Sequence, residues 1–259
     1  MSKIKTEAEI KILKEGGKKL ANILRSVAKE TKPGVSTWFL NEKAKSLIDK
    51  AGAKAAFFNY VPEGASRPYP AVICISVNDE IVHGIPNENP KTLKDGDIVK
   101  LDCGISYKGL FTDSAITVIV NERNTPRDKD ARRLIRATEE ALVAAIRVAV
   151  PGNRINDIGA AIEKVAKKRG FAPARDLGGH SVGHAIHEEP YIPNYKVTGK
   201  SALIEEGMVL AIEPMLVEKK GDIKLLSDNW TYVTKDGGRA AHAEHTVVIR
   251  KSRPEILTL

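Results

Sequence analysis

The sequence predicts an α+β fold in which two similar α/β halves, about residues 6–120 and 125–250, surround one shared antiparallel sheet. We expect a single domain covering residues 1–259. Three observations support this prediction. A pattern of helix, Pro-Gly, helix and Gly occurs twice with the same internal spacing. The segment after each helix pair combines an acidic-Gly turn, an apolar run and a carboxylate. No Pro/Ser/Gly-rich linker separates the two halves.

Each half is expected to begin with two helices. In the first half, the capping-box pattern Thr6-Glu7-Ala8-Glu9 opens a helix with apolar residues at helical spacing, and Pro33-Gly34 end it. A second helix starts at Ser36 or Thr37, and Gly52 is its expected end. The corresponding signals of the second half, with proline at the favoured first helical position, are Thr125-Pro126, Pro151-Gly152 and Gly170.

Residues 97–120 hold two apolar-rich runs on either side of Lys108-Gly109, which predicts a β-hairpin with a tight turn there. In that register Gly104 faces Asp113, and Asp102 becomes a diagonal neighbour of Asp113 on the same face. The glycine is expected to leave space between the two carboxylates. Two like charges about 4 Å apart repel by roughly 4 kcal/mol at an effective dielectric constant near 20, and a bound cation removes that cost. Exposed aspartates separated by water are the alternative.

Further candidate ligands lie in the second half. Glu213 precedes a proline, which favours extended geometry at a strand end. Glu244 lies just before the apolar run from Val247, which predicts another strand. The stretch LGGHSVGHAIHEEP, residues 177–190, holds three of the six histidines. Four carboxylates on sheet strands, together with one histidine of this stretch, would form an oxygen-rich site that suits two divalent ions of manganese, iron, cobalt or zinc. Neither Cys74 nor Cys103 lies in a Cys-x-x-Cys pattern, which disfavours zinc held only by nitrogen and sulfur.

Composition and charge place the chain among soluble cytoplasmic proteins. The 41 Lys and Arg residues exceed the 33 Asp and Glu residues and give a net charge of +8. Because the basic residues are scattered, we interpret this charge as favouring solubility, with attraction to nucleic acid or a ribosome as the alternative. No uncharged apolar run approaches the ~20 residues of a membrane span. The charged beginning of the chain is unlike a secretion signal, and two cysteines fit a reducing compartment.

Five motifs, in their order and spacing, closely resemble type I methionine aminopeptidase, and the resemblance covers nearly the whole chain. They are His83-Gly84-Ile85-Pro86, Asp102 with Asp113, His180 with His187-Glu188-Glu189-Pro190, Ile212-Glu213-Pro214-Met215 and Glu244-His245-Thr246. The resemblance implies a creatinase-like "pita-bread" fold with pseudo-twofold halves. It also implies hydrolytic removal of the initiator methionine from nascent proteins whose second residue is small, with a dinuclear metal centre and a bridging hydroxide.

Carried over position by position, the resemblance implies roles for the matching residues. Two divalent ions would be held by Asp102, Asp113, His180, Glu213 and Glu244. Asp102 would bind one ion, His180 and Glu213 would bind the other, and Asp113 and Glu244 would bridge them. Catalysis would involve His83, His187 and Glu213, with Glu213 as the proton shuttle and the two histidines at the scissile amide. The pocket for the methionine side chain would be lined by Tyr60, Tyr69, Cys74, Ile186 and Trp230.

Several neighbouring residues fall outside these roles. We interpret His184 as a solvated or locally hydrogen-bonded side chain. We expect His242 and His245 to point away from the face of the intervening glutamate, and either to support the ligands from outside or to be structural, rather than to bind metal. Two departures affect the methionine pocket, because the family commonly has an aromatic residue at the Ile186 position and a shorter connection in place of residues 61–68. That loop also lacks the family's histidine.

Two alternative functions remain open. A proline-specific aminopeptidase or dipeptidase shares the fold, but such relatives typically carry an extra N-terminal domain. A non-catalytic relative that contacts RNA or ribosomes is the other alternative, although such relatives lose ligands. The type II methionine enzyme is disfavoured because the 33 residues from His180 to Glu213 leave no room for its helical insertion. The expected partners are N-terminal methionyl peptides and nascent chains, and we expect a monomer. A contact with the ribosome surface stays open as the alternative interpretation of the basic charge.

Overall fold

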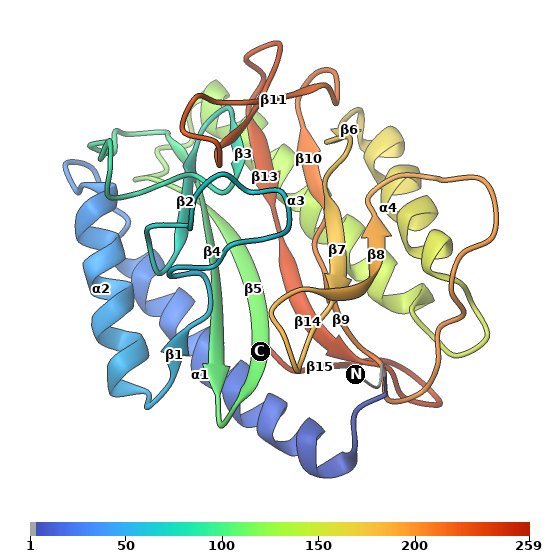
Figure 1. The fold of residues 1–259 in the computed structure, drawn as a ribbon. Helices are drawn as coiled ribbons and strands as arrows, with labels where there is room; N and C mark the ends of the chain where they lie inside the picture. Colours follow the sequence, from blue (N-terminus) through green and yellow to red (C-terminus); the bar gives the residue numbers. More distant parts are fainter. Residues whose placement is uncertain (1–3) are drawn as a thin grey trace.

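The structure is a computed structural model that describes residues 4–259. Its main feature in this range is a nine-stranded sheet whose neighbouring strands run antiparallel (Figure 1). The strand order is β1-β4-β5-β14-β9-β7-β8, while β2 also pairs with β4 and β15 with β14. Strands of the two halves meet where β5 pairs with β14, which confirms the predicted shared sheet.

Two three-stranded sheets complete the β structure, with the orders β13-β10-β6 and β11-β12-β3. The strands are β1 (Lys54–Ala55), β2 (Cys74–Val77), β3 (Glu80–Val82), β4 (Ile98–Tyr107), β5 (Leu110–Ile119), β6 (Ala172–Pro173), β7 (Gly178–Ser181), β8 (Glu188–Pro193), β9 (Val209–Ile212), β10 (Met215–Val217), β11 (Ile223–Leu225), β12 (Tyr232–Thr234), β13 (Ala240–His242), β14 (Glu244–Val248) and β15 (Glu255–Ile256). The helices are α1 (Glu7–Glu30), α2 (Thr37–Lys50), α3 (Pro126–Val148) and α4 (Ile155–Arg169). Across residues 4–259, none of these helices has both the length and the apolar character that crossing a bilayer requires.

The helix ends follow the predicted capping signals. Thr6 and Glu9 form a capping box at the start of α1, in which each side chain accepts a hydrogen bond from the backbone amide of the other. Ser36 caps α2, and Thr125 caps α3 with proline as the first helical residue. Gly170 ends α4 in the left-handed conformation, with φ at 78°. Each N-terminal cap stabilises its helix by about 0.5–2 kcal/mol, so these local signals fix the helix boundaries.

The alternation of side chains along β4 separates the core from the site. Val99, Leu101 and Ile105 are fully buried in a core shared with α1 and α2. Asp102 lies between them in sequence and therefore points to the opposite face of the sheet. A second core packs α3 and α4 against strands of the second half. Figure 1 shows the helices behind the sheet, which leaves the opposite face for the polar residues.

Candidate metal centre and substrate cavity

The β4–β5 hairpin places the first two predicted ligands. Its register pairs Gly104 with Asp113 and turns where predicted, so Asp102 lies diagonal to Asp113. Both aspartates are buried, and the alternative of exposed aspartates is therefore wrong. The expected space at Gly104 is occupied, because a Cβ atom there would come within 2.8 Å of Ile186 Cδ1 and of Phe57 Cε1. The glycine lets these two apolar side chains pack directly against the backbone of β4.

One cross-strand row joins Asp102 to Glu244. Cys74 pairs with Asp102, Asp102 with Ala115, and Ala115 with Glu244, across β2, β4, β5 and β14. Directly paired residues share one face of a sheet, so the small side chain of Ala115 separates the two carboxylates. Glu244 is buried, with an exposed fraction of 2%. The sheet register thus brings together carboxylates from both halves of the chain.

His180 and Glu213 reach the same face from β7 and from the end of β9. His180 pairs with Ala211, two residues before Glu213. Its Nε2 atom lies 3.5 Å from Glu213 Oε1 and 3.9 Å from Asp113 Oδ2. Its Nδ1 donates a hydrogen bond to the Ser181 carbonyl at 3.0 Å, because a carbonyl oxygen can only accept. Burial lowers the pKa of His180 to about 3, so the neutral ring presents an unprotonated Nε2 as a metal ligand.

Hydrogen bonds across the β5–β14 pair fix the backbone of two proposed ligands. Thr246 Oγ1 donates to the Asp113 carbonyl at 2.7 Å and accepts from the Asp113 amide at 2.9 Å. Ser114 Oγ donates to the Glu244 carbonyl at 2.8 Å. These three bonds use backbone atoms of the acidic residues, so they hold the carboxylates in place without occupying carboxylate oxygens.

The donor set fits divalent cations. Within the described range, three groups of side chains have ligand atoms within 4.8 Å of one another: Asp102, Asp113 and Glu244; His180, Glu213 and Glu244; and Asp113, His180 and His187. Glu244 belongs to two of these groups, and its buried Oε1 atom has no hydrogen-bond partner. Burial raises the pKa of Glu244 well above its usual range, and the neighbouring carboxylates add to that effect. Without cations such buried carboxylates hold protons, so bound metal ions explain the arrangement best.

His242 lies at the site, and the prediction that it points away is wrong. Its Nε2 atom is 3.5 Å from Glu213 Oε2 and 3.9 Å from Glu244 Oε2. The physical reason is the two-residue period of an extended chain, which puts residues 242 and 244 on one face. His245 is turned elsewhere and hydrogen-bonds Thr258 Oγ1 at 2.9 Å through Nδ1.

His184 forms a hydrogen bond that is not local, so the interpretation of a solvated or locally bonded side chain is wrong. Its Nε2 donates to Glu9 Oε1 at 2.6 Å, across 175 residues of sequence. The exposed fraction of the His184 side chain is 20%. The histidine therefore joins the loop between β7 and β8 to the first turn of α1.

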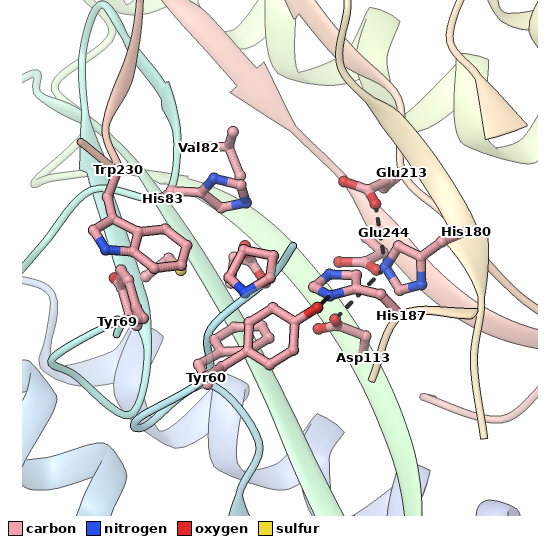
Figure 2. Close-up of a pocket in the computed structure, with 14 residues that line it drawn as sticks. Tyr60, Tyr69, Val82, His83, Asp113, His180, His187, Glu213, Trp230 and Glu244 are labelled. Atoms are coloured by element: carbon pink, nitrogen blue, oxygen red, sulfur yellow. Dashed lines mark hydrogen bonds and ion pairs between the residues drawn. The ribbon is translucent and has the colours of Figure 1, made fainter. Parts of the chain in front are cut away.

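A cavity of about 140 Å³ opens beside the carboxylates (Figure 2). Four predicted pocket residues line it, namely Tyr60, Tyr69, Cys74 and Trp230. Ile186, the fifth predicted pocket residue, is not among the lining residues and packs in the same apolar cluster as Tyr69 and Trp230. The lining residues that sequence reasoning missed are Phe57, Pro62 and Val82. Each stands within three positions of a predicted site residue, and that proximity is the signal that could have found them.

His83 and His187 reach the cavity from different elements. His83 directly follows β3 and has a left-handed backbone with φ at 59°, a conformation that often marks functional positions in non-glycine residues. Burial lowers the pKa of His83 to about 4, so its ring is neutral at pH 7. His187 hydrogen-bonds Tyr60 Oη at 2.8 Å, and its ring centre lies 4.4 Å from that of His180. Figure 2 shows His83 beside Trp230 and His187 beside His180.

This fold and its clustered ligands define a metallopeptidase. Residues 11–251 match metallopeptidase family M24. Because the match covers most of the 259 residues, the chain belongs to this family.

Within this family, the chain is similar over nearly its whole length to methionine aminopeptidases. A methionine aminopeptidase from Aquifex aeolicus is 44% identical over 255 residues, which are 98% of this chain and 97% of that protein. Methionine aminopeptidase 1 from Bacillus subtilis is 39% identical over 98% of each chain. The crystal structure of methionine aminopeptidase from Thermotoga maritima has a TM-score of 0.91 at 41% identity and covers 100% of this chain and 99% of that one. A prolidase from Pyrococcus furiosus, at 23% identity and a TM-score of 0.75, shares the fold alone and is covered over 65% of its length. The predicted fold and family resemblance are confirmed, and the chain lies among the methionine aminopeptidases.

Proposed function

We propose that the protein is a metal-dependent methionyl aminopeptidase that removes the N-terminal methionine from chains whose second residue is small. One observation carries this proposal: four buried carboxylates and His180 Nε2 converge beside a cavity walled by aromatic side chains. Oxygen-rich ligands favour divalent ions, and an apolar cavity suits the flexible thioether side chain of methionine. The carboxylate cluster thus suits the metal ions, and the apolar cavity suits the methionine side chain.

The residues proposed to hold two divalent ions are Asp102, Asp113, His180, Glu213 and Glu244. Four carboxylates carry enough negative charge to balance two such ions. When bound, the ions supply Lewis-acid polarisation of the peptide carbonyl and lower the pKa of water to about 7. Asp113, Glu244 and His180 each belong to two groups. Only a carboxylate has two oxygens to offer, so Asp113 and Glu244 are the residues that would bridge two ions. Cobalt, manganese, iron and zinc are all compatible ions, and metal analysis of protein purified without added ions would identify the native one.

The chain's own side chains position the substrate and move the proton. Glu213 faces His180 with Oε1 and His242 with Oε2, each at 3.5 Å, so one oxygen can carry a proton to the leaving amine. His83 and His187 lie at the cavity, where each neutral ring can donate a hydrogen bond to the peptide as charge develops on its oxygen. The aromatic walls of the cavity exclude water and hold the methionine side chain.

Release of methionine from the peptide Met-Ala-Ser tests the proposed function. We expect cleavage that stops with a chelator and returns with Mn²⁺ or Co²⁺. Cleavage of Xaa-Pro peptides instead would favour a proline-specific peptidase, and a metal-loaded protein that cleaves neither would favour a non-catalytic relative. The Asp113→Ala variant serves as the matched control, because it should keep its helical circular dichroism and lose both metal and activity. Full activity of a metal-free Asp113→Ala protein would contradict the scheme.

We also propose nascent chains as substrates for a monomeric enzyme with one catalytic domain over residues 1–259. Cys74 and Cys103 are both free thiols, which supports a reducing compartment such as the cytoplasm. The net charge of +8 supports a contact with the anionic surface of the ribosome. Cosedimentation with ribosomes should weaken as the ionic strength rises above about 0.15 M, and analytical ultracentrifugation would measure the oligomeric state.

A further inference from the structure

The first described residues are tied to the loop between β7 and β8, residues 182–187, which ends at His187. The side chain of Lys5 is fully buried, with an exposed fraction of 0%. Its Nζ donates to Glu188 Oε2 at 2.7 Å. The amide of Lys5 donates to the Gly207 carbonyl at 2.9 Å, which fixes this segment against the turn before β9. A buried ammonium group is rare in proteins unless it is paired, so this contact needs a reason.

Glu188 carries the contact into the loop. Its Oε1 accepts hydrogen bonds from the backbone amides of His184 and Ala185, the latter at 2.9 Å. One carboxylate therefore binds the ammonium of Lys5 with one oxygen and the loop backbone with the other. Glu188 directly follows His187 in the chain, so the same carboxylate fixes the backbone that presents the cavity histidine.

Two further contacts join the loop to the beginning of the chain. Gly183 has φ at 144°, and a Cβ atom there would come 2.3 Å from Lys5 Cε, so the loop leaves room for the lysine side chain. His184 donates to Glu9 Oε1 at 2.6 Å, which links the loop to the first turn of α1. The residues that make these contacts with Lys5 and Glu9, namely Gly183, His184 and Glu188, take no part in the three metal-binding groups.

We propose that Lys5 is a positioning residue for peptide cleavage, because through Glu188 it holds the 182–187 loop so that His187 faces the substrate. This inference rests on the proposed function. His180 is held by the pairing of β7 with β9 rather than by the loop, so metal binding does not depend on Lys5. Loss of the ammonium leaves a partly buried carboxylate without its cation, which loosens the loop. A displacement of about 1 Å at a group that contacts the substrate costs roughly 10²-fold in rate.

Lys5→Met tests the proposal, with Lys14→Met as the matched control. Lys14 also pairs with a glutamate, Glu255, but it does so at the surface, where 48% of its side chain is exposed. The readouts are kcat and KM with Met-Ala-Ser, the amount of bound metal, and hydrogen exchange across residues 182–187. We expect Lys5→Met to lower kcat by about 10- to 100-fold, to bind the wild-type amount of metal, and to exchange faster at the amides of His184 and Ala185. Lys14→Met should match the wild type in all three.

Glu188→Gln and the double variant separate positioning from general stability. Glutamine keeps an acceptor for the two amides and loses the charge, so it carries the same test if Lys5→Met does not fold. If Lys5 acts through Glu188, the double variant loses no more kcat than the worse single variant. Additive losses, a Lys5→Met protein with wild-type kcat, or unchanged exchange across the loop would each overturn the proposal. A wild-type protein that releases no methionine, together with a loosened loop in Lys5→Met, would instead refute the proposed function and leave the tie between Lys5 and the loop intact.

Discussion

Each half of the molecule supplies metal-binding candidates, but the two halves hold them in different ways. The first half contributes Asp102 and Asp113 from a single hairpin, whose register alone sets their relative position. The second half contributes His180, Glu213 and Glu244 from three separate segments: β7, the end of β9, and β14. A hairpin forms from local sequence, whereas three separate segments converge only when the sheet is assembled. The complete site therefore depends on how the two halves join.

That joint lies between β5 and β14. Thr246 on β14 binds the backbone of Asp113 on β5, and Ser114 on β5 binds the backbone of Glu244 on β14. The two contacts are reciprocal, since each strand supplies a hydroxyl to the ligand residue of the other. The backbone position of each of these two acidic residues is thus fixed by a hydroxyl group from the other half.

Glu244→Ala is expected to have the largest effect. Because Glu244 shares groups with proposed ligands of both halves, its loss should lower kcat/KM by about 10³-fold or more, equivalent to roughly 4 kcal/mol of transition-state stabilisation. Metal content per chain and kcat/KM with Met-Ala-Ser are the measurements. Asp102→Ala removes a carboxylate found in one group only, and it should retain more metal. Equal metal loss in the two variants would contradict the shared role of Glu244.

Leucine-to-alanine substitutions, which create a cavity in each core, test whether the two halves unfold together. Leu24 in the α1 core and Leu134 in the α3 core are both fully buried. Each change to alanine should lower the free energy of unfolding by about 2–5 kcal/mol. We expect a single urea transition in both variants because the halves share one sheet. A separate early transition in Leu24→Ala alone would show that the first half unfolds independently. Val143→Ala, at an exposed position of α3, is the control and should change stability by less than about 0.5 kcal/mol.

Thr246→Val probes the joint without removing a ligand. The valine keeps the shape of the side chain but cannot hydrogen-bond the backbone of Asp113. We expect metal affinity to fall by about 10- to 100-fold, as for other groups that support a ligand. Calorimetric titration of the metal-free protein would measure this change. Wild-type affinity in Thr246→Val would mean that the sheet register alone positions Asp113.

The difference between the halves also explains what the sequence could predict. The position of Asp102 relative to Asp113 followed from a turn signal and the period of a strand, both of which are local. The contact of His184 with Glu9 spans 175 residues and leaves no local pattern, so it was missed. The prediction that His242 points away from Glu244 was wrong, although residues two apart in a strand lie on the same face and the sequence shows that spacing. The convergence of β7, β9 and β14 on one site came from the family resemblance and not from residue patterns.

The smallest expected effect concerns the contact of Glu9 with His184. The hydrogen bond from His184, followed by that from the Thr6 amide, lowers the pKa of Glu9 from 4.5 to about 2. Because the folded pKa lies below the unfolded value, the contact stabilises the protein above about pH 4.5 and is lost as the pH falls toward 2. Glu9→Gln should reduce stability at pH 7 by less than about 1 kcal/mol and flatten the loss between pH 4.5 and 2. Urea unfolding at a series of pH values measures this, and an unchanged slope would contradict it.

Ala115 stands at the middle of the row that runs from Cys74 through Asp102 to Glu244, and it is buried. A single methyl group therefore sets the width of the gap between acidic groups from opposite halves. A bulkier residue at this position would push Asp102 and Glu244 apart without changing either residue. Such a protein would keep every proposed ligand in its sequence, and we nevertheless expect it to bind metal more weakly.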